Sequence, residues 1–189
     1  SVRSPSDYSS SDVMREVRTH LYRQPRVAGK IAKVIDALAS SGTKVLVLLD
    51  EVGQVPFLLP HLRSPTRLAH GGQQDKNEEL PPEMRRSDPL ALVREFNAGG
   101  IPILLGTGCI GTGVNFTPQG PMAVVWLVGG QSEVAFRQGV GRALRIEGKS
   151  SVQVLIPHVR NVPSLDRHYR ALADICADIW ETPKEVDLG

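Results

Sequence analysis

The chain has 189 residues, of which 41% are hydrophobic and 22% charged, and its formal net charge at pH 7 is +2. This composition is ordinary for a globular domain, so it excludes a chain that is disordered, collagen-like or coiled-coil along its whole length. The nearly balanced charge gives no strong global field for nucleic acid, and no apolar run approaches the length of a membrane-spanning helix.

The two cysteines, Cys109 and Cys176, lie far apart and lack the spacing of metal ligands. This arrangement argues against a disulfide scaffold and against a cysteine-based zinc site. It is typical of reduced thiols in a cytoplasmic protein. The five histidines are scattered, without the spacing of a metal site. We therefore expect no metal bound by this chain alone and no contact with a membrane.

Apolar spacing and helix-capping residues predict the elements in chain order. We expect a leader over residues 1–22, partly disordered or with a short helix, one domain over 23–182 and a tail over 183–189. Within the domain the sequence predicts a helix at 27–38, a strand at 44–49, a helix at 57–62, a polar loop at 71–86, a helix at 89–96, a strand at 101–105, a loop at 106–120, a strand at 122–128, a helix at 132–145, a strand at 151–156 and a helix at 164–180.

This alternation of strands and helices predicts an α/β fold with an open, mostly parallel sheet and helices on both faces. Such sheets bind ligands at the carboxyl ends of their strands. Trp126 falls within a predicted buried strand, and we expect its indole to pack in the core.

The most informative segment is Gln138–Arg145, which reads QGVGRALR. Gln138, Arg142 and Arg145 follow one another at spacings of four and three residues, so they share one face of the predicted helix. Gly141 allows a ligand or another backbone to come close. Two guanidinium groups on one face can clamp a polyphosphate, although a solvated basic face is the common role of helical arginines.

A second segment joins a buried strand to a glycine-rich and threonine-rich loop, Gly106–Gly120. Glycine N–H groups and the hydroxyls of Thr107 and Thr112 can hold phosphate oxygens. A plain turn between strands is the alternative. The loop is not a Walker A motif, because no Gly-Lys-Ser/Thr closes it.

In this order the segments resemble the second RecA-like domain of superfamily 2 helicases and translocases. Thr107 and the triplet Gly113-Val114-Asn115 resemble motif V, and Gln138–Arg145 matches the four defined positions of motif VI, Q-x-x-G-R-x-x-R. The strand 45–49 resembles motif IV, and Ala69-His70-Gly71-Gly72 resembles the short strand and His-Gly step that follow. The resemblance covers about residues 27–157 and implies a RecA-like three-layer sandwich.

The resemblance implies the C-terminal motor domain of an ATP-dependent helicase or translocase. Arg142 and Arg145 would be arginine fingers that reach an ATP held mainly by a first RecA-like domain, with Gln138 near the γ-phosphate and the attacking water. The first domain would also hold Mg²⁺, so the isolated chain is expected to be inactive. The implied nucleotide-facing positions are Gly113, Asn115 and Gly141. The implied contacts to a nucleic-acid backbone are Thr107, Gly108, His70 and Gly71.

One departure concerns the second residue of motif VI. Many family members carry Arg there, whereas this chain has Gly139. The difference disfavours a DEAD-box RNA helicase and favours DNA over RNA as the partner, with RNA still possible.

Two other functions remain open. The first is a non-catalytic RecA-like module that binds nucleic acid or a partner; the intact Gln138, Arg142 and Arg145 argue against it. The second is a complete nucleotide-binding protein in which Asp50 and Glu51 act as a Walker B pair, and the missing Walker A motif argues against that function.

Overall fold

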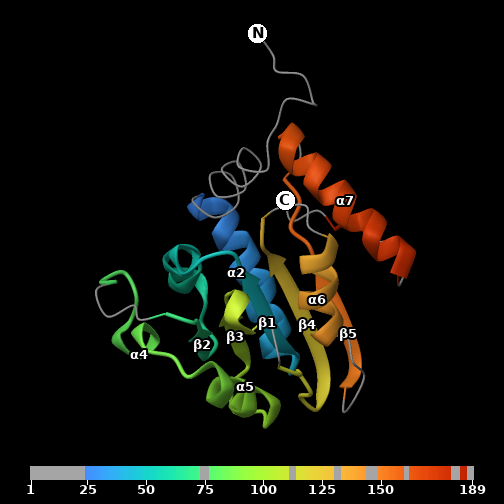
Figure 1. Cartoon of the computed structure of the whole chain (residues 1–189). Helices are drawn as coiled ribbons and strands as arrows, with labels where there is room; N and C mark the ends of the chain where they lie inside the picture. Colours follow the sequence, from blue (N-terminus) through green and yellow to red (C-terminus); the bar gives the residue numbers. More distant parts are fainter. Residues whose placement is uncertain are drawn as a thin grey trace.

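Five parallel strands form one sheet in the computed structural model, in the order β2-β3-β1-β4-β5 (Figure 1). The structure describes residues 24–72, 77–110, 114–129, 133–143, 149–159, 162–179 and 184–186. The strands are β1 (Lys44–Leu49), β2 (Thr66–Ala69), β3 (Ile103–Gly106), β4 (Gly120–Leu127) and β5 (Lys149–Leu155). The central position of β1 means that its side chains must find apolar partners on both faces of the sheet.

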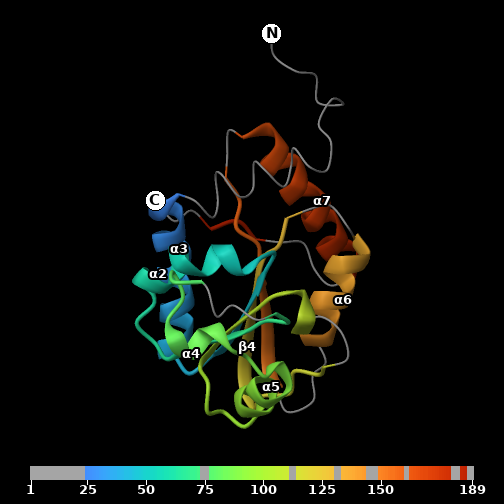
Figure 2. The same ribbon diagram turned by 60° about the vertical axis from the view of Figure 1, so that its left-hand side comes forward.

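Helices cover both faces of this sheet. They are α2 (Pro25–Ser40), α3 (Val55–Leu58), α4 (Pro82–Arg85), α5 (Pro89–Asn97), α6 (Glu133–Ala143) and α7 (Pro163–Ile179), with short 3-10 turns η3 (Val52–Gln54), η4 (Leu59–His61) and η5 (Gly108–Ile110). Figure 2 shows α2 and α3 on one side of the sheet and α6 on the other. None of the described helices is long and apolar enough to cross a membrane.

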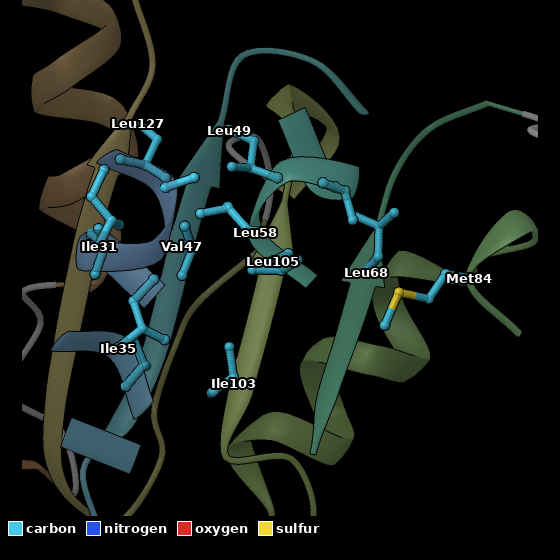
Figure 3. Packing of buried hydrophobic residues seen from close by; sticks show 14 of the residues in the cluster. Ile31, Ile35, Val47, Leu49, Leu58, Leu68, Met84, Ile103, Leu105 and Leu127 are labelled. Atoms are coloured by element: carbon cyan, nitrogen blue, oxygen red, sulfur yellow. The ribbon is translucent and has the colours of Figure 1, made fainter. Parts of the chain in front are cut away.

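The alternation of side chains along β1 divides the interior into two cores. Val45, Val47 and Leu49 face the core beneath α2 and α3, where Figure 3 shows Val47 and Leu49 among side chains from α2, α3 and β3. Leu46 and Leu48 face the opposite core, which α5 and α6 cover. All five side chains are at most 5% exposed.

Most of the predicted elements are confirmed. Strand β1 has the predicted bounds, and β3, β4 and β5 lie within two residues of theirs at each end. Helix α5 begins as predicted, because the Asp88 carboxylate accepts a hydrogen bond from the N–H of Ala91 at 3.0 Å and so caps the first turn. The predicted leader over 1–22 and Arg145 lie outside the described residues, as does most of the predicted tail over 183–189.

The prediction that 57–62 belongs to a helix with Pro56 near its start is confirmed in part: residues 57–58 lie in α3 and 59–61 in the 3-10 turn η4, since Pro60 has no N–H to donate to the carbonyl of Pro56. One prediction about local structure was wrong. The polar loop predicted at 71–86 contains helix α4. Its Met84, together with the preceding Leu80, is buried in the core beneath α2 and α3.

The half-buried carboxylate of Asp36 on α2 is hydrogen-bonded to the segment that leads into β2. Asp36 Oδ2 accepts from the N–H of Arg63 at 2.8 Å, and Oδ1 accepts from the N–H of Ser64 at 3.0 Å. Partial burial raises the pKa of Asp36, but the hydrogen bonds from Ser64 and Arg63 outweigh it, so the pKa lies below the ordinary value of 3.8. The ionised carboxylate therefore stabilises the fold.

We predict that Asp36→Ala lowers the free energy of unfolding by about 1 kcal/mol at pH 7, a modest value because water screens this site. The contribution is present above pH 3.8, where the unfolded carboxyl ionises, and is lost as the pH falls through the lower folded pKa. Urea unfolding at pH 7 and pH 3 measures both effects. Asp174→Ala, at an exposed position on α7, is the control; an equal loss in the two variants would contradict the prediction.

Candidate functional site

A pocket of about 220 Å³ opens where β3, β1 and β4 end, beside the first turns of α6. Its polar lining consists of Asp50 after β1, Thr107 and Gly108 after β3, and Gln138 on α6. Apolar side chains from β1, β4 and α6 form the rest of the wall. The carboxyl edge of a parallel sheet is the place where such folds bind ligands.

The pocket brings together two segments that the sequence analysis singled out separately. Thr107 is the first residue of the motif V-like segment, Gln138 is the first residue of the motif VI-like segment within α6, and both line the same cavity. Gln138 is exposed and Thr107 is half-buried. A hydroxyl and a carboxamide in one pocket can donate hydrogen bonds to phosphate or carbonyl oxygens.

The structure places the other predicted nucleotide-facing residues apart from this pocket or does not describe them. Asn115 is exposed, and its carbonyl accepts a hydrogen bond from Asn97 at the end of α5 at 3.0 Å. Gly113 and Arg145 lie outside the described residues, and so does the side chain of Arg142. Gly141 lies within α6, and no atom of the described residues lies within 4 Å of the place a Cβ would take there. Their roles stay predictions.

His70 is held inside the protein. It is 2% exposed, its Nε2 donates to the carbonyl of Met84 at 3.0 Å, and its backbone N–H donates to the hydroxyl of Ser87 at 3.1 Å. The imidazole therefore fastens α4 to the end of β2. The next residue, Gly71, is exposed and close to η5, since a Cβ there would lie 3.1 Å from Cys109 Cβ. A nucleic-acid contact at this step stays a prediction, and Gly71 is the accessible residue for it.

Close packing explains the first glycine of the motif V-like loop. Gly106 ends β3, and a Cβ at this position would overlap the side chain of Ile110, which is fully buried. The turn is closed by a hydrogen bond of 3.1 Å from Ile110 N–H to the Thr107 carbonyl, while Thr107 N–H donates to Ala69 on β2 at 3.1 Å. Thr107 is thus fixed at the edge of the pocket by its own backbone.

Gln54 is a residue that the sequence analysis missed. Its side chain is 1% exposed; Oε1 accepts from the N–H groups of Asp50 and Glu51 at 2.6 and 2.7 Å, and Nε2 donates to the carbonyl of Leu127 at 3.0 Å. The amide therefore joins the ends of β1 and β4 behind the pocket. The spacing of Glu51 and Gln54 is that of a capping box, which was the available sequence signal.

Among the described residues, no group of three or more His, Cys, Asp or Glu side chains is arranged to hold a metal ion.

No family model matches the sequence, and no curated protein matches it either. Solved structures do match. The C-terminal part of the Fun30 ATPase domain superimposes with a TM-score of 0.55 at 14% identity, covering 84% of this chain and 45% of that one. The structure of T4 UvsW gives a TM-score of 0.61 at 15% identity, covering 92% of this chain and 36% of that one.

The chain has a RecA-like fold. The sequence prediction of this fold, with a parallel sheet between two layers of helices, is confirmed. The chain spans less than half of the length of each of these two structures. The likeness establishes an architecture, and function must be argued from the site.

A buried histidine secures the last helix of the RecA-like domain beside the pocket. His168 on α7 is 6% exposed and has a hydrogen bond with the backbone of Val128, which lines the pocket. Burial lowers the pKa of His168 below its ordinary value of 6.5, and the bond to Val128 offsets only part of that effect. The imidazole is therefore neutral in the folded protein at pH 7.

We predict that Gln54→Leu lowers the free energy of unfolding by about 2–3 kcal/mol, because buried backbone groups at the ends of β1 and β4 lose their hydrogen-bond partner. Gln153→Leu makes the same chemical change at an exposed position on β5 and is the matched control. We expect the control to stay within about 0.5 kcal/mol of the native chain. Urea unfolding measures both, and comparable losses would refute a structural role for the Gln54 amide.

We predict that the free energy of unfolding decreases at acidic pH and that His168 causes part of this decrease. The unfolded imidazole takes up a proton near pH 6.5, whereas the buried one does so only at lower pH, so stability falls as the pH drops below 6.5. The contribution is at most about 1.4 kcal/mol per pH unit. Between pH 7.5 and 5.5, the free energy of unfolding should fall less with decreasing pH for His168→Gln than for the native chain. His61→Gln, at an exposed histidine, is the control; parallel curves for the native and His168→Gln chains would rule out this linkage.

Proposed function

We propose that the chain is the C-terminal motor domain of an ATP-dependent superfamily 2 helicase or translocase. The observation that carries the proposal is the meeting of Thr107 and Gln138, the first residues of the two motif-like segments, in one pocket at the carboxyl edge of the sheet. A RecA-like fold provides the expected frame. The Fun30 structure, named as part of an ATPase domain, is consistent with a role linked to ATP.

The residues present fit one half of a nucleotide site. The pocket offers the Gln138 amide to the nucleotide, while the Thr107 hydroxyl and the Gly108 backbone, which share its lining, are the proposed nucleic-acid contacts. The sequence has no complete Walker A motif to hold the β- and γ-phosphates: Gly148-Lys149-Ser150 is present, but Ala143 stands where the first glycine of Gly-x-x-x-x-Gly-Lys-Ser is required. We therefore place ATP between this domain and a first RecA-like domain, which would hold the phosphates and Mg²⁺.

In this arrangement α6 delivers the groups that act on the γ-phosphate. The helix continues through Ala143, so Arg142 follows Gln138 by one turn on the same face. Arg142 and Arg145 would neutralise the charge that spreads over the phosphoryl oxygens during transfer to water, and Gln138 would orient that water. Closure and opening of the two domains around ATP would then move the nucleic-acid strand.

The ends of β2 and β3 are the proposed contact with the nucleic-acid backbone. These strands are neighbours in the sheet, and the exposed Gly71 and Gly108 follow them. Together with the Thr107 hydroxyl they offer small polar groups that suit phosphate oxygens, which position a strand without reading its sequence. DNA is the proposed partner, on the basis of Gly139 in the motif VI-like segment. Both cysteines are free, which supports a cytoplasmic location.

The test is ATP hydrolysis, with and without DNA, by the full-length protein that contains this chain. We predict that Arg142→Ala and Arg145→Ala each lower the hydrolysis rate by about 10³-fold or more while ATP binding largely persists, as the loss of an arginine finger does. Arg170→Ala, at an arginine of α7 whose side chain is 74% exposed, is the matched control and should leave the rate unchanged.

Near-normal hydrolysis in both arginine variants would refute the motor function and favour a non-catalytic binding module. Hydrolysis by the isolated 189-residue chain would also contradict the proposal, because it would require a complete nucleotide site built around Asp50 and Glu51.

A further inference from the structure

The space beneath the motif VI-like helix is filled by a tryptophan from the sheet. Trp126 lies one residue before the end of β4, opposite Leu48 of β1, and is 6% exposed. Its ring meets the ring of Phe136 on α6 edge to face, with centroids 5.0 Å apart and an interplanar angle of 79°. The indole thus forms a direct contact between the central sheet and the first part of α6.

The indole leaves no room for a side chain at position 139. A Cβ on Gly139 would lie 2.8 Å from Trp126 Cζ3, 3.4 Å from Cη2 and 3.5 Å from Leu48 Cδ1. The first distance is shorter than real Cβ contacts allow. Glycine is unfavourable inside a helix, and at this position the indole supplies a packing reason for it.

The neighbouring glycine of the same helix shows that the constraint is local. A Cβ on Gly141, two residues further along α6, would meet no atom of the described residues within 4 Å. The steric restriction at position 139 is therefore not shared by this second glycine. This contrast provides a control within one helix.

We propose that Trp126 and Gly139 form a matched pair that sets the distance between α6 and the sheet, and that Trp126 is thereby a positioning residue for Gln138. Gln138 directly precedes Gly139 and lines the pocket with Thr107. A larger residue at 139 would lift this part of α6 and carry Gln138 away from the pocket. The absence of Arg after the motif VI glutamine is then the steric consequence of the indole. The kinetic part of this inference rests on the proposed function; the packing part does not.

The packing part is tested by tryptophan fluorescence and unfolding of the 189-residue chain. The sequence has two tryptophans, so Trp180→Phe leaves Trp126 as the only emitter. In this background we expect Gly139→Ala to shift the emission to longer wavelength and to lower the urea midpoint, because the indole is displaced toward water. Gly141→Ala should leave the emission unchanged. A native emission maximum and midpoint in Gly139→Ala would overturn the pair.

Rescue by a second substitution provides the sharper test. This test uses the chain that keeps Trp180. Trp126→Phe removes the ring atoms that a Cβ at position 139 would strike. The double variant Gly139→Ala with Trp126→Phe should therefore unfold at a higher urea concentration than Gly139→Ala alone, close to the native midpoint. Should Gly139→Ala fail to fold, recovery of a folded chain in the double variant is the expected result. Losses that simply add in the double variant would overturn the pair.

The kinetic part uses ATP hydrolysis by the full-length protein. We expect Gly139→Ala to lower kcat by about 100-fold, the scale of a displacement of about 1 Å at a catalytic group, with a much smaller change in KM for ATP. The double variant should recover most of kcat, and Val134→Ala, at an exposed position of α6, should match the native protein. Rescue of the midpoint without rescue of kcat would overturn the positioning role. A native protein that does not hydrolyse ATP would instead refute the proposed function and leave the packing test to stand.

Discussion

The complete burial of β1 is the constraint on which the rest of the structure depends. The side chains of Val45–Leu49 are at most 5% exposed, so neither face of the strand can lie against water. Apolar layers are therefore required on both sides, and α2 and α3 supply one while α5 and α6 supply the other. Along its edges β1 pairs with β3 and β4, and the ends of these three strands enclose the pocket. The site therefore lies at the end of the most buried part of the sheet.

The buried groups that support the pocket differ from the polar groups at its edge, although the Trp126 indole also forms part of the apolar wall. Gln54 joins the ends of β1 and β4, His168 fastens α7 beside Val128, and the Trp126 indole supports α6. Each of these side chains is at most 6% exposed. Gln138 is exposed and Thr107 half-buried at the pocket edge, so neither belongs to the buried core. Such a division keeps polar groups available for a ligand at little cost to the fold.

Sequence patterns predicted the elements whose signals are local. The apolar run of β1 and the Asp88 cap of α5 need only a few neighbouring residues, and both predictions were accurate. Helix α4 was missed because Leu80 and Met84 are isolated apolar residues in a polar stretch. Their role becomes visible only in the folded structure, where both pack in the core beneath α2 and α3. The glycine at 139 could be noticed but not explained, since its cause is an indole on another element. The meeting of the two motif-like segments in one pocket was not predicted, because it depends on how the strands and α6 pack, and the hydrogen bonds of Gln54 behind the pocket were not predicted either.

Helix α7 takes part in both halves of the interior. Leu165, near its beginning, belongs to the core beneath α2 and α3, whereas Leu172 and Cys176 belong to the core beneath α5 and α6. A fragment that ended after β5 would therefore lack part of each core at once, on either side of the same sheet. Among the described elements, α7 is the last to leave the ribosome, and its docking completes both cores. Until it docks, a nascent chain has all five strands but neither core complete, so apolar surface on both faces of the sheet stays open to misassociation.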